Sequence, residues 1–97
     1  MRIISIKPLR DFWLKHPQAE TPLRNWYAEA NHAKWLTPAD IKASHRNASF
    51  IAGNRVVFNI KGNDYRLIVA VRYTAGLMFI RFVGTHSEYG RIDANNI

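Results

Sequence analysis

The stretch of sequence that decides the fold is VVFNIKGNDYRLIVAVRYTAGLMFIRFVGT, residues 56–85. Long runs of it consist of β-branched and aromatic residues, and residues that favour turns separate these runs. With a shorter run just upstream, the predicted strands are residues 50–52, 56–60, 65–73 and 77–83, and the turns lie at 53–54, 61–64 and 75–76. Because such short turns make consecutive strands antiparallel neighbours, the pattern predicts a meander of four strands.

Upstream of the meander, the hydrophobic spacing changes from that of strands to that of helices. The isoleucine-rich residues 2–6 predict a first strand, and Pro8 then favours the first turn of a helix. Two amphipathic helices are expected, with stripes formed by Leu9, Phe12, Trp13 and His16 and by Leu23, Trp26, Tyr27 and Ala30. Thr37-Pro38-Ala39-Asp40 offers an N-cap and a proline at the first helical position, which predicts a short third helix or turn.

These elements predict an α+β fold, with the N-terminal strand and a helical hairpin packed on an antiparallel sheet. The helices must cover one face of the sheet, because their aromatic side chains need to be buried. At 97 residues the chain is expected to be one domain, residues 1–97. Trp13 and Trp26 lie in the apolar stripes and are expected in the core, whereas Trp35 is left open between a core position and stacking on a base.

The composition excludes several classes of protein. Cysteine is absent, which rules out a disulfide scaffold and thiolate metal sites. No run approaches the roughly 20 apolar residues of a membrane span, and the start lacks the continuous apolar core of a signal peptide. We therefore expect a cytoplasmic protein with no membrane partner. Fourteen Lys and Arg against seven Asp and Glu give a net charge of +7, which favours RNA or the ribosome as a partner.

Antiparallel pairing gathers four polar residues at one end of the predicted sheet. A turn near residues 75–76 sets Arg66 beside Gly84, so that His86 follows close to Arg66. Lys61 lies across the preceding turn from Arg66 and therefore at the same end of the sheet. Tyr89 comes three residues after His86, which brings the two side chains together if the segment turns helically.

A cluster of this composition fits RNA cleavage through the 2′-hydroxyl. That reaction needs an acid to protonate the leaving 5′-oxygen, fixed positive charge for the phosphorane, and a group that orients or deprotonates the 2′-hydroxyl. No metal or other cofactor is required. Taken singly, the same residues are more often an exposed lysine, strand arginines, a structural histidine and a tyrosine packed on a sheet edge.

The other histidines give no sign of a metal site. His16, His32 and His45 lack the His-x-x-x-His spacing and the nearby acids that metal ligation requires. We interpret them as surface or helix-end residues.

Two segments resemble the signature of the HigB family. They are NIKGNDYRLI, residues 59–68, and FVGTHSEY, residues 82–89. HigB proteins are toxins of bacterial toxin–antitoxin pairs, within the RelE-like superfamily of ribosome-dependent mRNA endoribonucleases. The resemblance implies metal-independent cleavage of mRNA in the ribosomal A site, and neutralisation by a cognate antitoxin, usually a helix-turn-helix DNA-binding protein.

The resemblance also implies roles for single residues. Arg66 and Lys61 would hold the scissile phosphate, His86 would act as general acid, and Tyr89 would stack on or orient the nucleotide, while the general base stays unassigned. Further RNA contacts are expected from Arg72, Arg81 and Arg91.

One position departs from the family pattern. The family usually has an aspartate after the tyrosine, where this chain has Gly90. If that aspartate orients the site or acts as the base, this chain is weakened unless Glu88 or Asp93 replaces it. Two other functions therefore stay open at this point. One is a non-catalytic module that binds the ribosome or RNA, and the other is a repression partner that acts only in an antitoxin complex on DNA.

Overall fold

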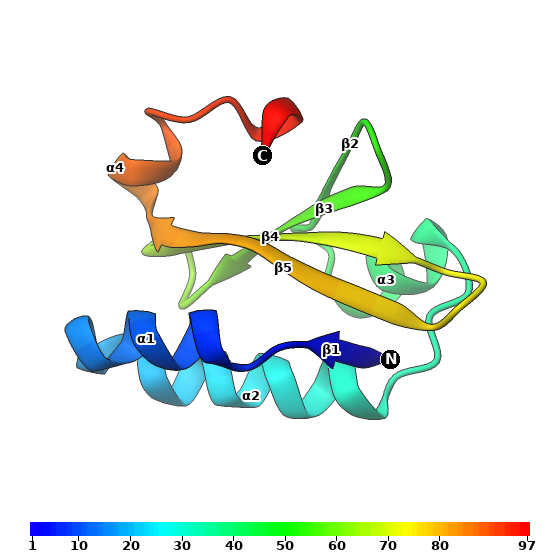
Figure 1. The fold of residues 1–97 in the computed structure, drawn as a ribbon, viewed down its shortest axis with the longest axis horizontal. Helices are drawn as coiled ribbons and strands as arrows, with labels where there is room; N and C mark the ends of the chain where they lie inside the picture. The colour runs from blue at the N-terminus through cyan, green and yellow to red at the C-terminus, as the bar shows by residue number, and fades with distance from the viewer.

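The meander predicted from residues 50–83 forms the centre of a computed structural model that describes residues 1–97. The strands are β1 (Arg2–Ile4), β2 (Ser49–Ile51), β3 (Arg55–Ile60), β4 (Tyr65–Arg72) and β5 (Leu77–Thr85). The helices are α1 (Lys7–Lys15), α2 (Glu20–His32), α3 (Pro38–Ser44) and α4 (His86–Tyr89), with 3₁₀ turns η1 (Pro17–Ala19) and η2 (Ala94–Asn96). The order in the sheet is β1-β5-β4-β3-β2, so the α+β prediction and the antiparallel meander are confirmed (Figure 1).

The first strand takes a place that the sequence pattern did not specify. β1 lies at the edge of the sheet, parallel to β5, with Ile3 opposite Met78. It ends at Ile4, two residues before the predicted end, because α1 begins at Lys7 with Pro8 in its first turn. Ile3 is buried, and its neighbours in the strand are exposed. A parallel strand needs a long crossover before its partner, and the rest of the fold provides that connection.

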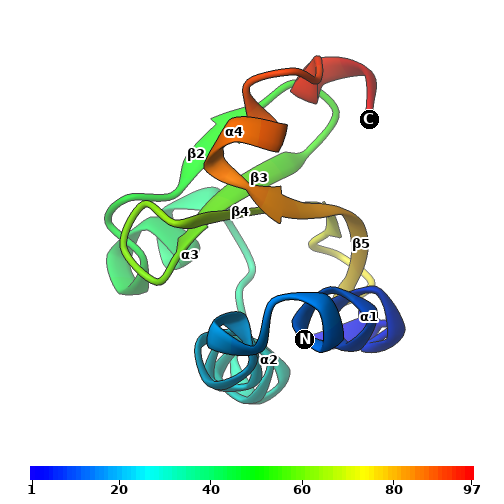
Figure 2. The same ribbon diagram turned by 90° about the vertical axis from the view of Figure 1, so that its left-hand side faces the viewer.

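α1 and α2 lie side by side against one face of the sheet (Figures 1 and 2). Their apolar stripes form the main core, in which Leu9 and Leu23 are fully buried and Trp13 and Trp26 are each 4% exposed. The predicted third helix is confirmed as α3, and it packs Ile41 into the same core. No helix is long and apolar enough to cross a membrane.

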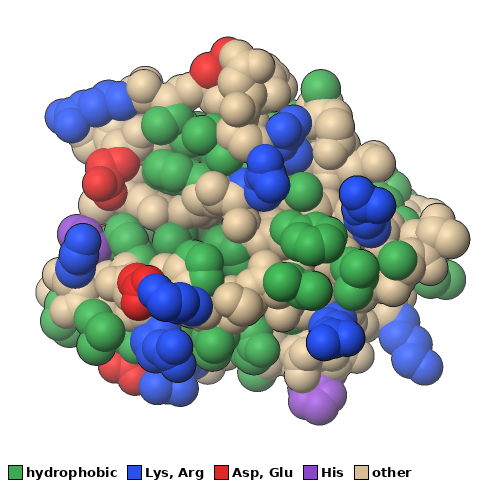
Figure 3. Space-filling model, in the orientation of Figure 1, with side chains coloured by type: hydrophobic (Ala, Val, Ile, Leu, Met, Phe, Trp, Pro, Cys, Tyr) green, Lys and Arg blue, Asp and Glu red, His purple; other side chains and the backbone are tan.

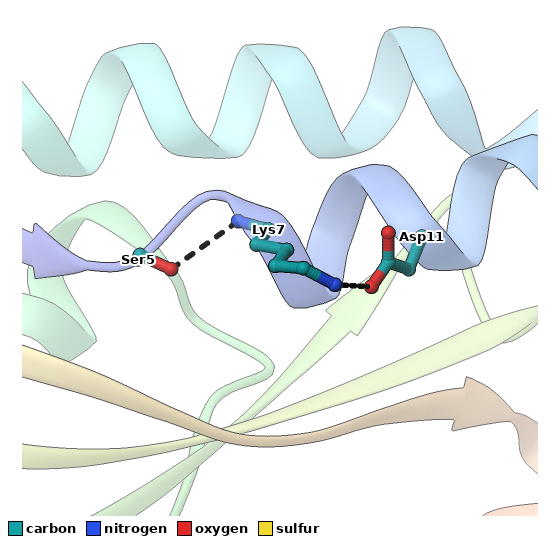
Figure 4. Close-up of polar contacts among 3 residues, drawn as sticks. All are labelled: Ser5, Lys7 and Asp11. Carbon is teal, nitrogen blue, oxygen red and sulfur yellow. Dashed lines mark hydrogen bonds and ion pairs between the residues drawn. The ribbon is translucent and has the colours of Figure 1, made fainter.

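An exposed ion pair lies on the solvent-facing surface of α1 (Figure 4). Lys7 Nζ donates to Asp11 Oδ2 at 2.7 Å across one helical turn. This hydrogen bond lowers the pKa of Asp11. Such pairs on a helix surface favour the local helix and leave the core packing unchanged.

The other face of the sheet carries a second, smaller apolar layer. Val57 and Ile68 are opposite each other in the register and buried, yet they lie outside the main core. α4 and the C-terminal segment lie on this side, away from α1 and α2 (Figure 2). Arg55 attaches that segment, since its Nη1 donates to the carbonyl oxygen of Asn95 at 3.3 Å. We call this side the outer face, and it is the face that carries Arg66.

Candidate active site

α4 begins where β5 ends, and a capping box sets its direction. The Glu88 amide donates to Thr85 Oγ1 at 3.1 Å, and the Thr85 amide donates to Glu88 Oε1 at 2.8 Å. These two bonds satisfy backbone donors that the first turn of a helix leaves free. The hydrogen bond from the Thr85 amide is the main cause of the lowered pKa of Glu88. The cap therefore places His86 at the first position of α4 and Tyr89 at the last.

Gly84 allows an aromatic ring to lie against the end of β5. A Cβ atom built on Gly84 would stand 2.5 Å from Phe82 Cζ, which is closer than any real contact. The Phe82 ring in turn lies near the Tyr89 ring, with 6.5 Å between their centroids. The absence of a side chain at Gly84 therefore leaves room for the Phe82 ring, which packs near the Tyr89 ring.

Arg66 is opposite Gly84, as the turn geometry predicted. Its Nη1 donates to the carbonyl oxygens of Asn63 and Tyr65 at 3.1 and 3.3 Å, and its Nη2 contacts Asn63 Oδ1 at 3.4 Å. The guanidinium carbon lies 5.8 Å from the centre of the Tyr89 ring. All of these partners are neutral, and no carboxylate pairs with Arg66 in this structure. Its positive charge is therefore held in place and left uncompensated.

His86 lies at the same end of the sheet, with an exposed side chain. Its backbone amide donates to the carbonyl oxygen of Asp64 at 3.0 Å, which ties α4 to the turn between β3 and β4. The imidazole has no hydrogen bond or ion pair within the chain. It is therefore free to meet a ligand.

Lys61 shares this end of the sheet but makes its contacts elsewhere. Its Nζ lies 3.1 Å from Gln18 Oε1 and 3.3 Å from Asp64 Oδ2, on the side of the 3₁₀ turn η1. No hydrogen bond connects it with Arg66, His86 or Tyr89. The structure thus brings Arg66 and Tyr89 into contact, places His86 on the same short helix as Tyr89, and leaves Lys61 paired with an acid.

Both acidic residues near Gly90 accept hydrogen bonds within the chain. Glu88 is engaged in the capping box, and Asp93 accepts hydrogen bonds from the Asn95 amide and from Asn96 Nδ2. Gly90 itself is the C-cap of α4, with helical φ and ψ of −64° and −14°. The structure therefore offers no free carboxylate at the position that the family pattern fills.

The three arginines expected to contact RNA lie in two places. Arg72 and Arg81 line one hollow at the far end of the outer face. Arg91 follows α4 and helps to lower the pKa of Glu88 through its charge. All three are exposed.

The fold brings a further histidine, His16, near this end of the sheet. The sequence alone indicated only that His16 lies on the surface or at the end of a helix. His16 caps the C-terminus of α1, and its ring stacks on Phe12 with 4.3 Å between centroids. Its charge also contributes to the lowered pKa of Glu88, so the two side chains are near each other. His16 and Glu88 are 72 positions apart in the sequence, so no local motif shows that they are near each other.

The structure corrects the expectation for His45 and decides the question left open for Trp35. His45, taken as a surface or helix-end residue without nearby acids, is the C-cap of α3 but is partly buried against Phe58, and its Nε2 lies 3.1 Å from Glu29 Oε1. Trp35, left open between core and base stacking, is 5% exposed and stacks on Phe58 in the core. Both differences arise because α2, α3 and β3 meet there, although they are far apart in sequence. The chain has no group of three His, Asp or Glu residues arranged to hold a metal ion.

Comparisons with known proteins find relatives that are similar over most of the chain. Residues 19–92 match the model of the HigB toxin family, described as the RelE-like toxic component of a toxin–antitoxin system. The mRNA interferase toxin HigB of Escherichia coli K12 is 34% identical over 92 residues, covering 92% of this chain and 88% of that protein. The mRNA interferase HigB of Shigella flexneri has the same identity and coverage. The mRNA interferase HigB of Escherichia coli O6:H1 is 24% identical over 94 residues, covering 95% of this chain and 91% of that protein.

Proposed function

Because the chain belongs to the HigB family of RelE-like toxins, we propose that it is the mRNA-cleaving toxin of a toxin–antitoxin pair, acting on ribosome-bound mRNA. Cleavage proceeds through the 2′-hydroxyl of the RNA. The 2′-hydroxyl gives its proton to a general base, for which no residue is assigned, and its oxygen attacks phosphorus. The bond to the 5′-oxygen breaks as that oxygen takes up a proton, and the products end in a 2′,3′-cyclic phosphate and a 5′-hydroxyl. The protein has to stabilise the added negative charge and supply a proton to the leaving oxygen.

The observation that carries this proposal is the state of Arg66. Three hydrogen bonds to neutral oxygens orient its guanidinium, and no acid neutralises it. A preoriented positive charge stabilises a phosphorane more than a mobile, solvated charge does, because the charge need not reorient during the reaction. The contact with the Tyr89 ring puts an aromatic face next to this charge, where it can stack on a base beside the scissile phosphate.

His86 supplies the proton. An imidazolium ring can donate a proton to a leaving oxygen, and histidine is the side chain that most often acts as a general acid. The unpaired ring at the start of α4 supports this role, as does its place on the same short helix as Tyr89. Lys61 has a lesser part than the family pattern assigns, because Asp64 already offsets its charge. It adds to phosphate binding once RNA displaces that contact.

A cognate antitoxin neutralises the toxin. The net charge of +7 favours an acidic partner surface that competes with the ribosome for the same cations. The resemblance to this family implies an antitoxin that is a helix-turn-helix DNA-binding protein. The gene beside the toxin gene is where that partner is expected.

One observation favours a second candidate function. Gly90 leaves the site without the expected carboxylate, and Glu88 and Asp93 are both engaged elsewhere. A site without a free carboxylate is what a protein that binds the ribosome without cleaving mRNA would have. Ribosome binding at parental strength with no cleavage at any mRNA position would identify this alternative.

The test is a comparison of two histidine variants in single-turnover cleavage of ribosome-bound mRNA. His86→Gln should lower the rate by about a hundred- to ten-thousandfold, because a general acid is lost. It should also relieve growth arrest on induction.

His32→Gln is the matched control, since His32 lies exposed at the end of α2 and has no bond to the site. It should cleave at the parental rate. Cleavage by His86→Gln at the same rate as His32→Gln would remove the acid role from His86 and leave the chemistry to Arg66, Lys61 and Tyr89.

A further inference from the structure

A hollow of about 670 Å³ opens on the outer face, at the end of the sheet opposite α4. The ends of β4 and β5 and the turn between β2 and β3 form its walls. Among the side chains that line it are Arg72, Tyr73, Phe79 and Arg81. Neither the main core nor the site at α4 accounts for this feature.

The hollow is cationic and has no acid in its wall. Arg72 and Arg81 are exposed, and neither makes a hydrogen bond or an ion pair within the chain. Figure 3 agrees with this charge distribution, because the half of that view with the turn between β4 and β5 shows Lys and Arg beside apolar side chains and no acidic side chain. Two guanidinium groups are thus available for an anion.

A β-bulge lies at the second arginine of the hollow. Ile68 is opposite Phe82 and Val69 is opposite Ile80, so Arg81 is the extra residue on β5. Phe79 is opposite Ala70, and both Phe79 and Arg81 line the hollow. The wall of the hollow therefore combines an aromatic ring with two guanidinium groups that have no partner within the chain.

The hollow lies on the same face of the sheet as Arg66. Arg66 and Arg72 are six residues apart on β4, hence on one face and about 20 Å from each other. Positive charge interleaved with aromatic rings along one surface is typical of grooves that track a single strand of nucleic acid. An acidic protein would also pair with the charges, but it would not need an aromatic ring in the same hollow.

We propose that this hollow binds a second nucleotide of the same single-stranded RNA, away from the scissile bond, with Arg72 and Arg81 on its phosphates and Phe79 under its base. The inference rests on the proposed function and extends it, because it assigns an RNA contact remote from the site at α4.

The test measures binding of a short single-stranded RNA that carries 2′-O-methyl groups, which prevent cleavage, by fluorescence anisotropy at several salt concentrations. Arg72→Ala/Arg81→Ala is compared with Arg10→Ala/Arg46→Ala, which removes the same charge from two exposed arginines outside the hollow. Thermal unfolding of each variant shows that it folds. The first variant should lose at least tenfold more affinity than the control, and its salt slope should fall by about 1.4, the value for two released phosphates on a single strand. Phe79→Leu should weaken binding about fivefold or more.

Three results would overturn the inference. Equal losses in the two double variants would mean that only the overall charge matters. Unchanged RNA binding with weakened binding of the antitoxin would assign the hollow to a protein partner. No binding of the oligonucleotide by the parental chain would remove the RNA site altogether. The readout is binding, so a parental chain that binds this RNA through the hollow yet cleaves no ribosome-bound mRNA would contradict the proposed function alone.

Discussion

Arg66 illustrates how the neighbours of one residue decide what it can do. An arginine near the end of a strand is usually a solvated side chain that adds little. Here the carbonyl oxygens of Asn63 and Tyr65 and the side chain of Asn63 hold the guanidinium in one orientation. The result is a directed positive charge instead of a mobile one.

The first prediction separates charge from geometry at this residue. Arg66→Ala should lower single-turnover cleavage about a hundred- to thousandfold, because a preoriented donor to the transition state is lost. Arg66→Lys keeps the charge but lacks the planar fork, so it should recover only part of that loss. Ribosome binding, measured by cosedimentation, should change little in both variants. A lysine variant that cleaves as fast as the parent would show that charge alone is sufficient.

Histidines show the same dependence on neighbours. His86 and His45 look alike in the sequence, since each follows a stretch of ordinary helix or strand formers. In the structure the His86 ring is unpaired at the end of the sheet, whereas the His45 ring packs on Phe58 and contacts Glu29. Only the first has a ring that is free to transfer a proton to a ligand.

At the scale of the element, α4 is a helix of four residues that depends on its cap. A helix this short is not stable in isolation, because ordering the backbone of the first turn loses more free energy than its one or two hydrogen bonds supply. The reciprocal bonds between Thr85 and Glu88 compensate for part of that cost. The position of His86 and Tyr89 therefore depends on the ionised state of Glu88.

The second prediction follows from that dependence. The pKa of Glu88 in the folded chain lies below its ordinary value of 4.5, so the charged cap stabilises α4 fully above that pH. The stabilisation is lost as the pH falls through the lowered value, when the carboxylate is protonated. The Thr85 amide resonance, followed by NMR, should move upfield over that range as its acceptor weakens. Glu88→Gln should show no such transition, and a transition that persists in this variant would assign it to another group.

The third prediction concerns the C-cap of α4. Gly90 has helical dihedral angles, and a Cβ atom there would meet only ordinary contacts, the nearest at 3.5 Å from the Ser87 carbonyl oxygen. Gly90→Asp should therefore fold as the parent does, with a small gain in stability because the unfolded chain loses freedom. If the family's aspartate assists the reaction, this variant should cleave ribosome-bound mRNA faster than the parent.

Gly90→Asn is the control for this experiment, since it adds a side chain of the same shape without the charge. Equal rates for Gly90→Asp, Gly90→Asn and the parent would show that the chain does not need a carboxylate at position 90. The departure from the family pattern would then be without consequence for catalysis.

At the scale of the whole molecule, charge and topology act together. Fourteen basic residues lie on a body with a radius of gyration of 12.3 Å, and the two α-helices that cover one face of the sheet leave the outer face to Arg66, Arg72 and Arg81. A long-range positive field guides the approach to RNA, whereas the single arginines determine where it is held.

The fourth prediction is the salt dependence of ribosome binding. Affinity measured by cosedimentation should fall steeply between about 50 and 200 mM salt, because each neutralised phosphate releases condensed counterions. Cleavage by bound complexes under single-turnover conditions should change much less over the same range. Binding that is flat across this range would contradict a contact made mainly through phosphates.

Much of the architecture could be read from the sequence because it depends on local periodicity. The turns at residues 61–64 and 75–76 place Arg66 opposite Gly84, as expected from counting residues on either side of a hairpin. The same reasoning correctly predicted α3 from Thr37 and Pro38 and the burial of Trp13 and Trp26. Each of these inferences needs only neighbours within a few tens of residues.

Other features were decided only by the tertiary structure, because they depend on contacts between distant segments. The pairing of Lys61 with Gln18 and the burial of Trp35 and His45 each join elements that no local spacing connects. The bulge at Arg81 depends on how β4 and β5 pair, because the sequence of one strand does not show where its register with the neighbouring strand shifts. The sequence by itself thus determined the strands, the helices and the end of the sheet where the site lies. The three-dimensional packing decided which charges are neutralised and which are left free for a ligand, because pairing depends on distances that only the folded chain defines.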